Sequence, residues 1–212
     1  MALIFAQLVK LFMVIKMTKI IGLTGGIATG KSVISNYLKQ KNIPIIDADQ
    51  ITHQVEKRGQ SGFDAIVSHF GGQILDETGE IDRQRLARIV FSDSKSLKQL
   101  VRIIDPHIRS AIFQQVSMHL QAQLVVIDAP TLFENGYIHL VDEVVVVYCD
   151  SVTQLHRLMK RNRLSISEAN ARIKNQWPLQ IKCNLANTIM YNSGTIKETL
   201  IQVDQWLANE ID

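Results

Sequence analysis

The sequence predicts an α/β fold in which helices cover both faces of a doubly wound parallel sheet. Short runs of consecutive apolar residues recur along the chain, as expected of strands buried on both faces of such a sheet. Helical patterns follow several of these runs, and a Gly-rich turn separates the first run from the first helix. This alternation of strand and helix is typical of the α/β class.

The strands are expected at residues 19–23, 43–46, 124–127, 144–148 and, with a weaker pattern, 188–190. A helical pattern over residues 31–39 follows the first of them. Later in the chain, Ser165 and Glu168 fit a capping box, which predicts a helix that runs toward Asn175.

The middle of the chain has a different character. Between residues 50 and 123 strand-like runs almost vanish and helical periodicity dominates. Breaks in the helices are expected at Gly71-Gly72, Gly79 and Pro106. We interpret this part as a helical subdomain inserted over the carboxyl edge of the sheet.

The N-terminal segment is apolar but interrupted by Lys10, and it is too short to span a bilayer. It lacks a basic leading region and a small-residue cleavage site, so a secretory signal is not expected. Met13 and Met17 are alternative starts. We therefore expect residues 1–17 to be a non-native or dispensable extension. The alternative is an amphipathic segment that rests on a membrane or a partner.

Composition excludes few classes of function. A formal net charge of +3 over 212 residues is too small to indicate nucleic acid, and it suits phosphate-rich small ligands equally well. Cys149 and Cys183 have neither metal-ligand spacing nor the density of a disulfide scaffold. We expect two reduced, non-catalytic thiols in a cytoplasmic protein without nucleic-acid or membrane partners, either a monomer or a small homo-oligomer.

The strongest signal is the segment Gly25-Gly26-Ile27-Ala28-Thr29-Gly30-Lys31-Ser32, which fits G-x-x-x-x-G-K-[ST] at every fixed position. Glycines let successive backbone N–H groups point into one anion-sized concavity, and the following helix adds the positive end of its dipole. Lys31 can reach the β- and γ-phosphates, and the Ser32 hydroxyl can bind Mg²⁺. The alternative, a Gly-rich turn without a ligand, is disfavoured by the position between a strand and a helix.

A segment of this kind is called a phosphate-binding loop, or P-loop. By itself it does not identify the reaction. A GTPase would need the guanine-reading motif N-K-x-D, which the sequence lacks. The D-x-x-G match at Asp76-Glu77-Thr78-Gly79 lies in a polar turn, so we interpret it as accidental. A motor or transport ATPase would usually be longer, and the length therefore favours a small kinase.

A kinase that acts on a hydroxyl needs a group near the γ-phosphate that orients or accepts the proton. Asp47 and Asp49 follow the second strand, at the edge where an open α/β sheet places ligands. We favour Asp49; the alternative is a helix N-cap and a solvated turn carboxylate. Asp128 ends the third strand, where a carboxylate commonly holds the metal through water. The alternative there is a turn residue before Pro130.

Basic residues follow the fourth strand. Arg157 and Arg161 are four apart on a predicted helix, so they project from one face, and Arg163 follows. Arginines on a mobile segment can close over phosphates and neutralise the charge that builds during transfer. A solvated basic face is the alternative.

Several further short segments accompany the P-loop in a fixed order. They are Ile46-Asp47-Ala48-Asp49, Ile81-Asp82-Arg83 with Leu86, Pro106 with Ile108, Ile127-Asp-Ala-Pro-Thr-Leu-Phe-Glu134, Gln154 with Arg157 and Arg161, Arg172 with Gln176, and Asn192-Ser193-Gly194. With them, the sequence from residue 18 to the C-terminus resembles the dephospho-CoA kinase family. No single piece is specific, but the order over nearly the whole chain is.

The resemblance implies a nucleotide-kinase-like P-loop domain over residues 18–212, with a helical acceptor-binding insertion at about 50–123 and a lid at about 151–178. The implied reaction transfers the γ-phosphoryl group of ATP to the ribose 3′-hydroxyl of dephospho-CoA. This is the last step of coenzyme A synthesis, and Mg²⁺ assists it.

The resemblance also implies roles for particular residues. The catalytic residues are Asp49 as the base, Lys31 and the lid residue Arg161. The ATP-binding residues are Gly25, Gly26, Ile27, Ala28, Thr29, Gly30, Lys31, Ser32, Val33, Arg157 and, near the adenine, Asn192. The acceptor-side residues are Thr24, Asp49, Arg83 and Glu134, and the metal ligands are Ser32 and Asp128.

The sequence departs from the family pattern at Ala28, His53, Asp105 and Asn187, where Gly, Arg, His and Asp are usual. Ala28 requires a loop backbone that is compatible with a Cβ. None of the changes touches Lys31, Ser32 or Asp49, so phosphoryl transfer is not expected to be affected. The changes at positions 53 and 105 bear on how the acceptor is bound.

Two other functions fit parts of the pattern. Another small-molecule kinase, for a nucleoside or a nucleoside monophosphate, would have a similar build. A catalytically silent nucleotide-binding module would signal to a partner by lid closure. The pair Asp47 and Asp49 argues against the silent module, because binding alone needs no acceptor-side carboxylate.

Overall fold

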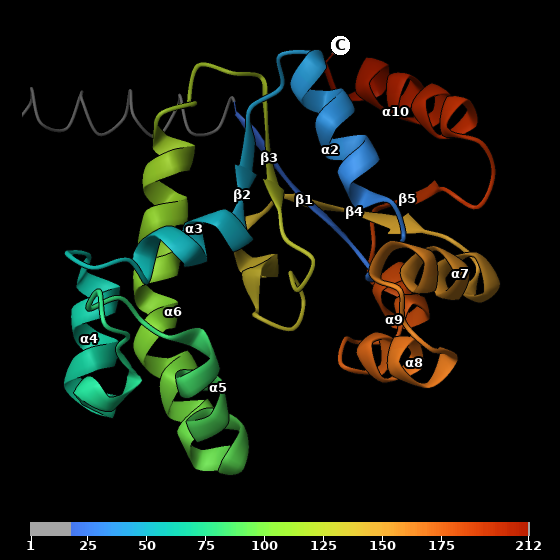
Figure 1. The fold of residues 1–212 in the computed structure, drawn as a ribbon. Helices are drawn as coiled ribbons and strands as arrows, with labels where there is room; N and C mark the ends of the chain where they lie inside the picture. The colour runs from blue at the N-terminus through green and yellow to red at the C-terminus, as the bar shows by residue number, and fades with distance from the viewer. Residues whose placement is uncertain (1–17, 212) are drawn as a thin grey trace, which may run out of the picture. The chain divides into compact units, whose positions relative to one another are not determined.

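The computed structural model describes residues 18–211 (Figure 1). The expected N-terminal extension, residues 1–17, lies outside the described residues. Two compact units divide the chain: one contains the described residues up to Ile46 together with those from His119 onward, and the other is Asp47–Met118. Along residues 18–211, no helix combines the length and the apolar character that a membrane crossing needs.

The first unit is built on a five-stranded sheet with the strand order β2-β3-β1-β4-β5. Its strands are β1 (Lys19–Gly25), β2 (Ile45–Asp47), β3 (Leu124–Asp128), β4 (Glu143–Tyr148) and β5 (Thr188–Tyr191). β1 pairs in parallel with β3 on one side and with β4 on the other, and β4 pairs in parallel with β5. The predicted strands and the parallel arrangement are confirmed.

The central strands owe their stability to burial on both faces. Every residue of β3 is buried, and so are the four valines of β4. Val and Ile favour the extended backbone because their branched side chains pack well on a pleated surface. Burial on both faces also explains why these strands show no alternation of polar and apolar residues.

Helices flank this sheet. They are α2 (Lys31–Gln40), α7 (Ser151–Asn162), α8 (Ile166–Lys174), α9 (Leu179–Asn184) and α10 (Ile196–Ile211), with a 3₁₀ turn at Tyr137–Leu140. α2 and α10 lie side by side in Figure 1. Their apolar faces join the strands in one core, to which α2 contributes Ile34 and Leu38, and α10 contributes Val203 and Trp206.

The capping box predicted at the start of α8 is confirmed. Ser165 Oγ accepts a hydrogen bond from the Glu168 N–H at 3.3 Å, and Glu168 Oε2 accepts one from the Ser165 N–H at 2.8 Å. The helix ends at the C-cap residue Asn175, as expected. A cap of this kind stabilises a helix by about 1 kcal/mol.

The second unit is helical, as the periodicity predicts. Its helices are α3 (Ala48–Val55), α4 (Ser61–Phe70), α5 (Arg83–Ser92) and α6 (Ser94–Ser117), with a 3₁₀ turn at Gly72–Ile74. α3, α4 and α5 all pack on the long helix α6 (Figure 1). The predicted breaks at Gly71 and Gly79 are confirmed, because α4 ends at Phe70 and Gly79 lies in a turn with a φ of 81°.

The break predicted at Pro106 is wrong, because α6 continues through it. A proline inside a helix removes one backbone hydrogen bond and destabilises the helix by about 3 kcal/mol. Here the helix has a buried face on both sides of the proline, formed by Ile104, Ile108 and Ile112. Packing of three other helices against α6 therefore outweighs the local effect of the proline.

Candidate active site

The P-loop residues connect β1 to α2, and two of them have left-handed backbone conformations. Gly30 is the N-cap of α2 with a φ of 94°, and Ala28 has a φ of 62°. Thr29 closes the loop on itself, because its N–H and its Oγ1 both donate to the Gly26 carbonyl, at 3.2 and 2.9 Å. Ala28 therefore occupies, with its Cβ, a conformation that usually favours glycine, at a cost of about 1 kcal/mol.

The residues Asn192 and Arg157 are tied to the loop. The Asn192 amide donates to the Thr29 carbonyl at 2.7 Å, and its Oδ1 accepts from the Thr199 hydroxyl at 2.9 Å. Arg157 Nη1 donates to the Asn192 carbonyl at 2.7 Å. Asn192 is buried, so its side chain is held in one orientation by donors and acceptors on both sides.

Two glutamines hold the Ile27 residue of the loop. Gln176 Oε1 accepts from the Ile27 N–H at 2.7 Å, and Gln154 Nε2 donates to the Ile27 carbonyl at 2.9 Å. Gln154 belongs to α7 and is buried, and Gln176 lies between α8 and α9. Both glutamines stand in the sequence segments that carry the family resemblance, which assigns them no role of their own. Their contacts with the loop have no local sequence signal, because the partners are more than a hundred residues apart.

Lys31 and Asp128 form an ion pair between Lys31 Nζ and Asp128 Oδ1. The side chain of Asp128 is only 8% exposed and that of Lys31 is 17% exposed. The parallel register of β1 and β3 accounts for their proximity, because it sets Leu23, just before the loop, opposite Asp128. The predicted phosphate-binding cation and the predicted metal-binding carboxylate thus meet at the carboxyl edge of the sheet.

The oxygen donors at this edge fit Mg²⁺. Ser32 in the first turn of α2 offers a hydroxyl and Asp128 offers a carboxylate, and both are the hard ligands that Mg²⁺ prefers. Within residues 18–211, no group of three or more His, Cys, Asp or Glu side chains could hold a metal ion. Mg²⁺ usually takes one or two protein ligands and completes its shell with phosphates and water, so this donor set suffices for a metal that binds with a nucleotide.

Thr24 and Glu134, both predicted on the acceptor side, are connected through Lys182. Thr24 Oγ1 and Lys182 Nζ donate to the same carbonyl, that of Pro130, at 3.1 and 2.8 Å. Lys182 also pairs with Glu134 Oε1 at 2.7 Å. Sequence reasoning missed Lys182, because a single lysine in a short helix is normally a solvated residue.

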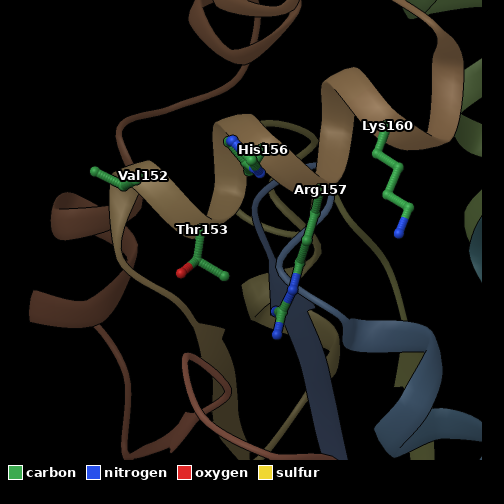
Figure 2. A pocket seen from close by; sticks show the side chains of 5 residues that line it. All are labelled: Val152, Thr153, His156, Arg157 and Lys160. Carbon is green, nitrogen blue, oxygen red and sulfur yellow. The ribbon is translucent and has the colours of Figure 1, made fainter.

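The two predicted lid arginines differ in their surroundings. α7 lines a cavity of about 370 Å³ with Val152, Thr153, His156, Arg157 and Lys160. Figure 2 shows the Arg157 side chain extending from α7 toward β1 and the P-loop that follows it. Arg161 is exposed, and its Nε donates to Asn162 Oδ1 at 2.9 Å. The structure therefore joins Arg157, and not Arg161, to the loop.

Asp49 and Arg83 belong to the helical unit. Asp47 is the N-cap of α3, since its Oδ1 accepts from the Gln50 N–H at 2.9 Å, whereas Asp49 is exposed in the first turn. Arg83 Nη2 pairs with Glu56 Oε2 at 2.8 Å, and Arg83 Nη1 lies 3.3 Å from His53 Nε2. His53, one of the departures from the family pattern, is thus a direct neighbour of a predicted acceptor-side residue.

A cavity of about 230 Å³ adjoins these charged residues within the helical unit. Its lining combines an ionisable end with an apolar wall: Thr52, His53, Glu56, Arg83, Leu86, Ala87, Val90, Phe91, Leu97 and Leu100. Burial raises the pKa of the Glu56 carboxyl, and the positive charge of Arg83 opposes that shift.

Both cysteines are buried free thiols, as expected of reduced residues. Burial raises the pKa of the Cys149 thiol, although the neighbouring Arg157 guanidinium opposes the shift, and burial also raises the pKa of the Cys183 thiol. A raised pKa keeps a thiol protonated and therefore poorly nucleophilic at neutral pH.

Comparisons with known proteins agree with the geometry. The model of the dephospho-CoA kinase family matches residues 19–198. The chain is 45% identical to a dephospho-CoA kinase of Bacillus cereus over 91% of its length and 98% of that protein. It is 40% identical to the one from Enterococcus faecalis over 92% and 98%.

Solved structures are similar as well. A Thermus thermophilus protein superposes with a TM-score of 0.79 at 29% identity, with 91% of this chain and 97% of that chain covered. A dephospho-CoA kinase from Campylobacter jejuni superposes with a TM-score of 0.70 at 27% identity, with 92% and 100% covered.

Proposed function

The chain belongs to the dephospho-CoA kinase family and is an ATP-dependent kinase of coenzyme A synthesis, and we propose how its residues perform the transfer. The reaction moves the γ-phosphoryl group of ATP to the ribose 3′-hydroxyl of dephospho-CoA. The main support for the roles that we propose is the P-loop at the carboxyl edge of the sheet, where Lys31 pairs with Asp128.

ATP is held by the P-loop. Backbone N–H groups of this loop point at the phosphates, and the positive end of α2 adds to the attraction for anions. Lys31 binds the β- and γ-phosphates as a point charge. Arg157 and Asn192 complete the nucleotide site, and their hydrogen bond to each other supports a shared role. Ser32 and Asp128 would hold Mg²⁺, which would neutralise charge on the phosphates.

Asp49 is the base in this mechanism. Its carboxylate orients the 3′-hydroxyl and takes its proton as the new O–P bond forms and the bond from the γ-phosphorus to ADP breaks. Lys31 stays in contact with the phosphoryl group during its transfer. Arg161 closes over this group, where it excludes water and neutralises negative charge. Most of the acceleration comes from positioning and electrostatics, because the protein does little covalent chemistry.

The acceptor is bound by Thr24, Arg83 and Glu134 together with Asp49. Arg83, which pairs with Glu56 and lies near His53, stands at the ionisable end of an apolar cavity, and this combination suits an acceptor that is both charged and long. We place the enzyme in the cytoplasm as a monomer or a small homo-oligomer, with ATP and dephospho-CoA as its substrates.

The test is ADP release from ATP and Mg²⁺ in the presence of dephospho-CoA, adenosine, AMP and other nucleosides in turn. ADP that depends on dephospho-CoA supports the proposal. ADP that depends on AMP or a nucleoside supports a different small-molecule kinase, and no acceptor-dependent ADP supports a silent nucleotide-binding module. Lys31→Ala is the control, because it removes the phosphate-binding cation and should leave a folded chain with almost no transfer.

A further inference from the structure

Lys182 is a fully buried lysine in the first unit. Its side chain has 0% exposure, which is rare for a lysine unless its charge and its three donors are satisfied. Three oxygens surround the ammonium: Glu134 Oε1 at 2.7 Å, the Pro130 carbonyl at 2.8 Å and the Gly25 carbonyl at 3.5 Å. The buried charge is therefore compensated by one carboxylate and two carbonyls.

These three partners come from three separate parts of the site. Gly25 is the first residue of the P-loop, Pro130 lies in the turn that follows β3, and Glu134 lies four residues further on. Thr24 Oγ1 shares the Pro130 carbonyl with Lys182. Lys182 on the short helix α9 thus contacts the P-loop and Glu134 directly, and it shares the Pro130 carbonyl with Thr24.

Glu134 has one oxygen engaged and one that is not. Its Oε1 accepts from Lys182 Nζ and also from the Trp177 N–H at 3.0 Å. Its Oε2 is buried, and among residues 18–211 it has no hydrogen-bond partner. Buried polar atoms in proteins almost always have a hydrogen-bond partner, so this carboxylate oxygen is available to a donor from outside the chain, a ligand or a water.

We propose that Lys182 is a positioning residue for the acceptor. It fixes Glu134 through Oε1, so that Oε2 is presented to an O–H or N–H donor of dephospho-CoA, and it fixes Thr24 through the shared Pro130 carbonyl. Lys182 itself does not touch the substrate. The inference rests on the proposed function in one respect, the assignment of Glu134 to the acceptor side.

A purely structural ion pair would give a different pattern. Removing Lys182 alone leaves the Glu134 carboxylate buried and uncompensated, which is strongly destabilising, whereas replacing both partners by neutral groups relieves that penalty. If the pair serves stability only, activity should return together with stability in the double variant. If Lys182 acts through Glu134, stability should return while acceptor binding stays impaired.

The experiment compares Lys182→Met, Glu134→Gln and the double variant with the wild type. The measurements are the thermal midpoint, kcat, and KM for each substrate. Both single variants are expected to raise KM for dephospho-CoA about tenfold, the size expected for a lost hydrogen bond to a charged group. The double variant is expected to raise it no further, because the two residues act as one unit. KM for ATP should rise less than KM for dephospho-CoA, because Lys182 meets the P-loop only at 3.5 Å, from Nζ to the Gly25 carbonyl.

The thermal midpoint should fall most in Lys182→Met and recover in the double variant. Lys182→Arg keeps the cation and provides a second test if Lys182→Met does not fold: it should retain more acceptor affinity than the double variant. Lys197→Met, at an exposed position on α10, is the matched control and should change neither KM.

Four outcomes would overturn the inference. Acceptor KM could return to the wild-type value in the double variant, the two single effects could add, or KM for ATP could rise as much as KM for dephospho-CoA. A Glu134→Gln variant with unchanged acceptor KM would also overturn it. Failure of the proposed function is distinct from all of these, because the wild-type enzyme would then show no ADP release that depends on dephospho-CoA.

Discussion

The Asn192 side-chain amide packs directly against Gly30. It donates to the carbonyl of the preceding residue, Thr29, at 2.7 Å, and a Cβ added to Gly30 would overlap the Asn192 amide nitrogen. The φ of 94° at Gly30 also belongs to the left-handed region. Gly30 is therefore required for two independent reasons, its backbone conformation and the space that Asn192 occupies.

Gly30→Ala should weaken ATP binding by at least about tenfold, because the loop or Asn192 must shift and hydrogen bonds to the charged phosphates are lost. The measurement is the Kd for ATP by titration calorimetry. Gly59→Ala is the matched control: Gly59 has a similar φ of 83°, but an added Cβ would meet nothing within 4 Å. It should cost about 1 kcal/mol of stability and leave ATP binding unchanged. Equal ATP affinities in the two variants would contradict the steric argument.

Asp49→Asn should lower kcat by about 10²–10⁴-fold with little change in ATP affinity, because it removes the proposed base and keeps the shape of the side chain. Steady-state kinetics and a separate ATP titration check this. Asp47→Ala is the comparison two residues away, and it should cost about 1 kcal/mol of stability through loss of the α3 N-cap. Turnover like that of the wild type in Asp49→Asn would remove this residue from its role.

Arg157→Ala and Arg161→Ala should have different effects. Arg157 donates to the Asn192 carbonyl, so its loss should weaken ATP binding and lower the thermal midpoint. Arg161 is exposed, so its loss should leave stability within about 0.5 kcal/mol and lower kcat about 100-fold if it closes over the transferred group. Single-turnover kinetics with a parallel thermal scan separate the two. A normal kcat in Arg161→Ala would exclude it from catalysis.

Asp150 should make stability depend on pH in the acid range. Hydrogen bonds from the side chain and the backbone N–H of Thr153 lower the pKa of Asp150 from 3.8 to about 2. A carboxyl whose pKa is depressed in the folded state contributes stability that is fully present above the unfolded pKa and is lost as pH falls toward the folded one. The free energies of unfolding of the wild type and of Asp150→Asn, measured in urea, should therefore differ above about pH 4 and converge near pH 2. A difference that does not change between pH 5 and pH 2 would contradict this assignment.

Local sequence signals predicted most of the fold. The valine-rich strands and the Ser165 capping box depend on residues that are close in the chain, and both are confirmed. Pro106 is an exception to these local signals. A proline is expected to end a helix, but packing within the helical unit keeps α6 continuous through it.

The sequence predicted those parts of the site whose positions are determined by the ends of strands. Lys31 and Asp128 each follow or end a buried strand, and the parallel register brings them together. Lys182 and the two glutamines on Ile27 could not be found in this way, because their partners are distant in sequence and their residue types are ordinary for helices. The roles of Asp49, Arg83 and Arg161 remain predictions.

The Ile27 N–H, one of the P-loop donors, already has an acceptor in the Gln176 amide oxygen at 2.7 Å. A phosphate oxygen that takes this N–H has to replace that amide oxygen, so the number of hydrogen bonds at this point does not change. Any gain there comes from trading a neutral acceptor for a charged one. The displaced glutamine belongs to the connection between α8 and α9, so an arriving nucleotide releases this connection from its tether to the loop.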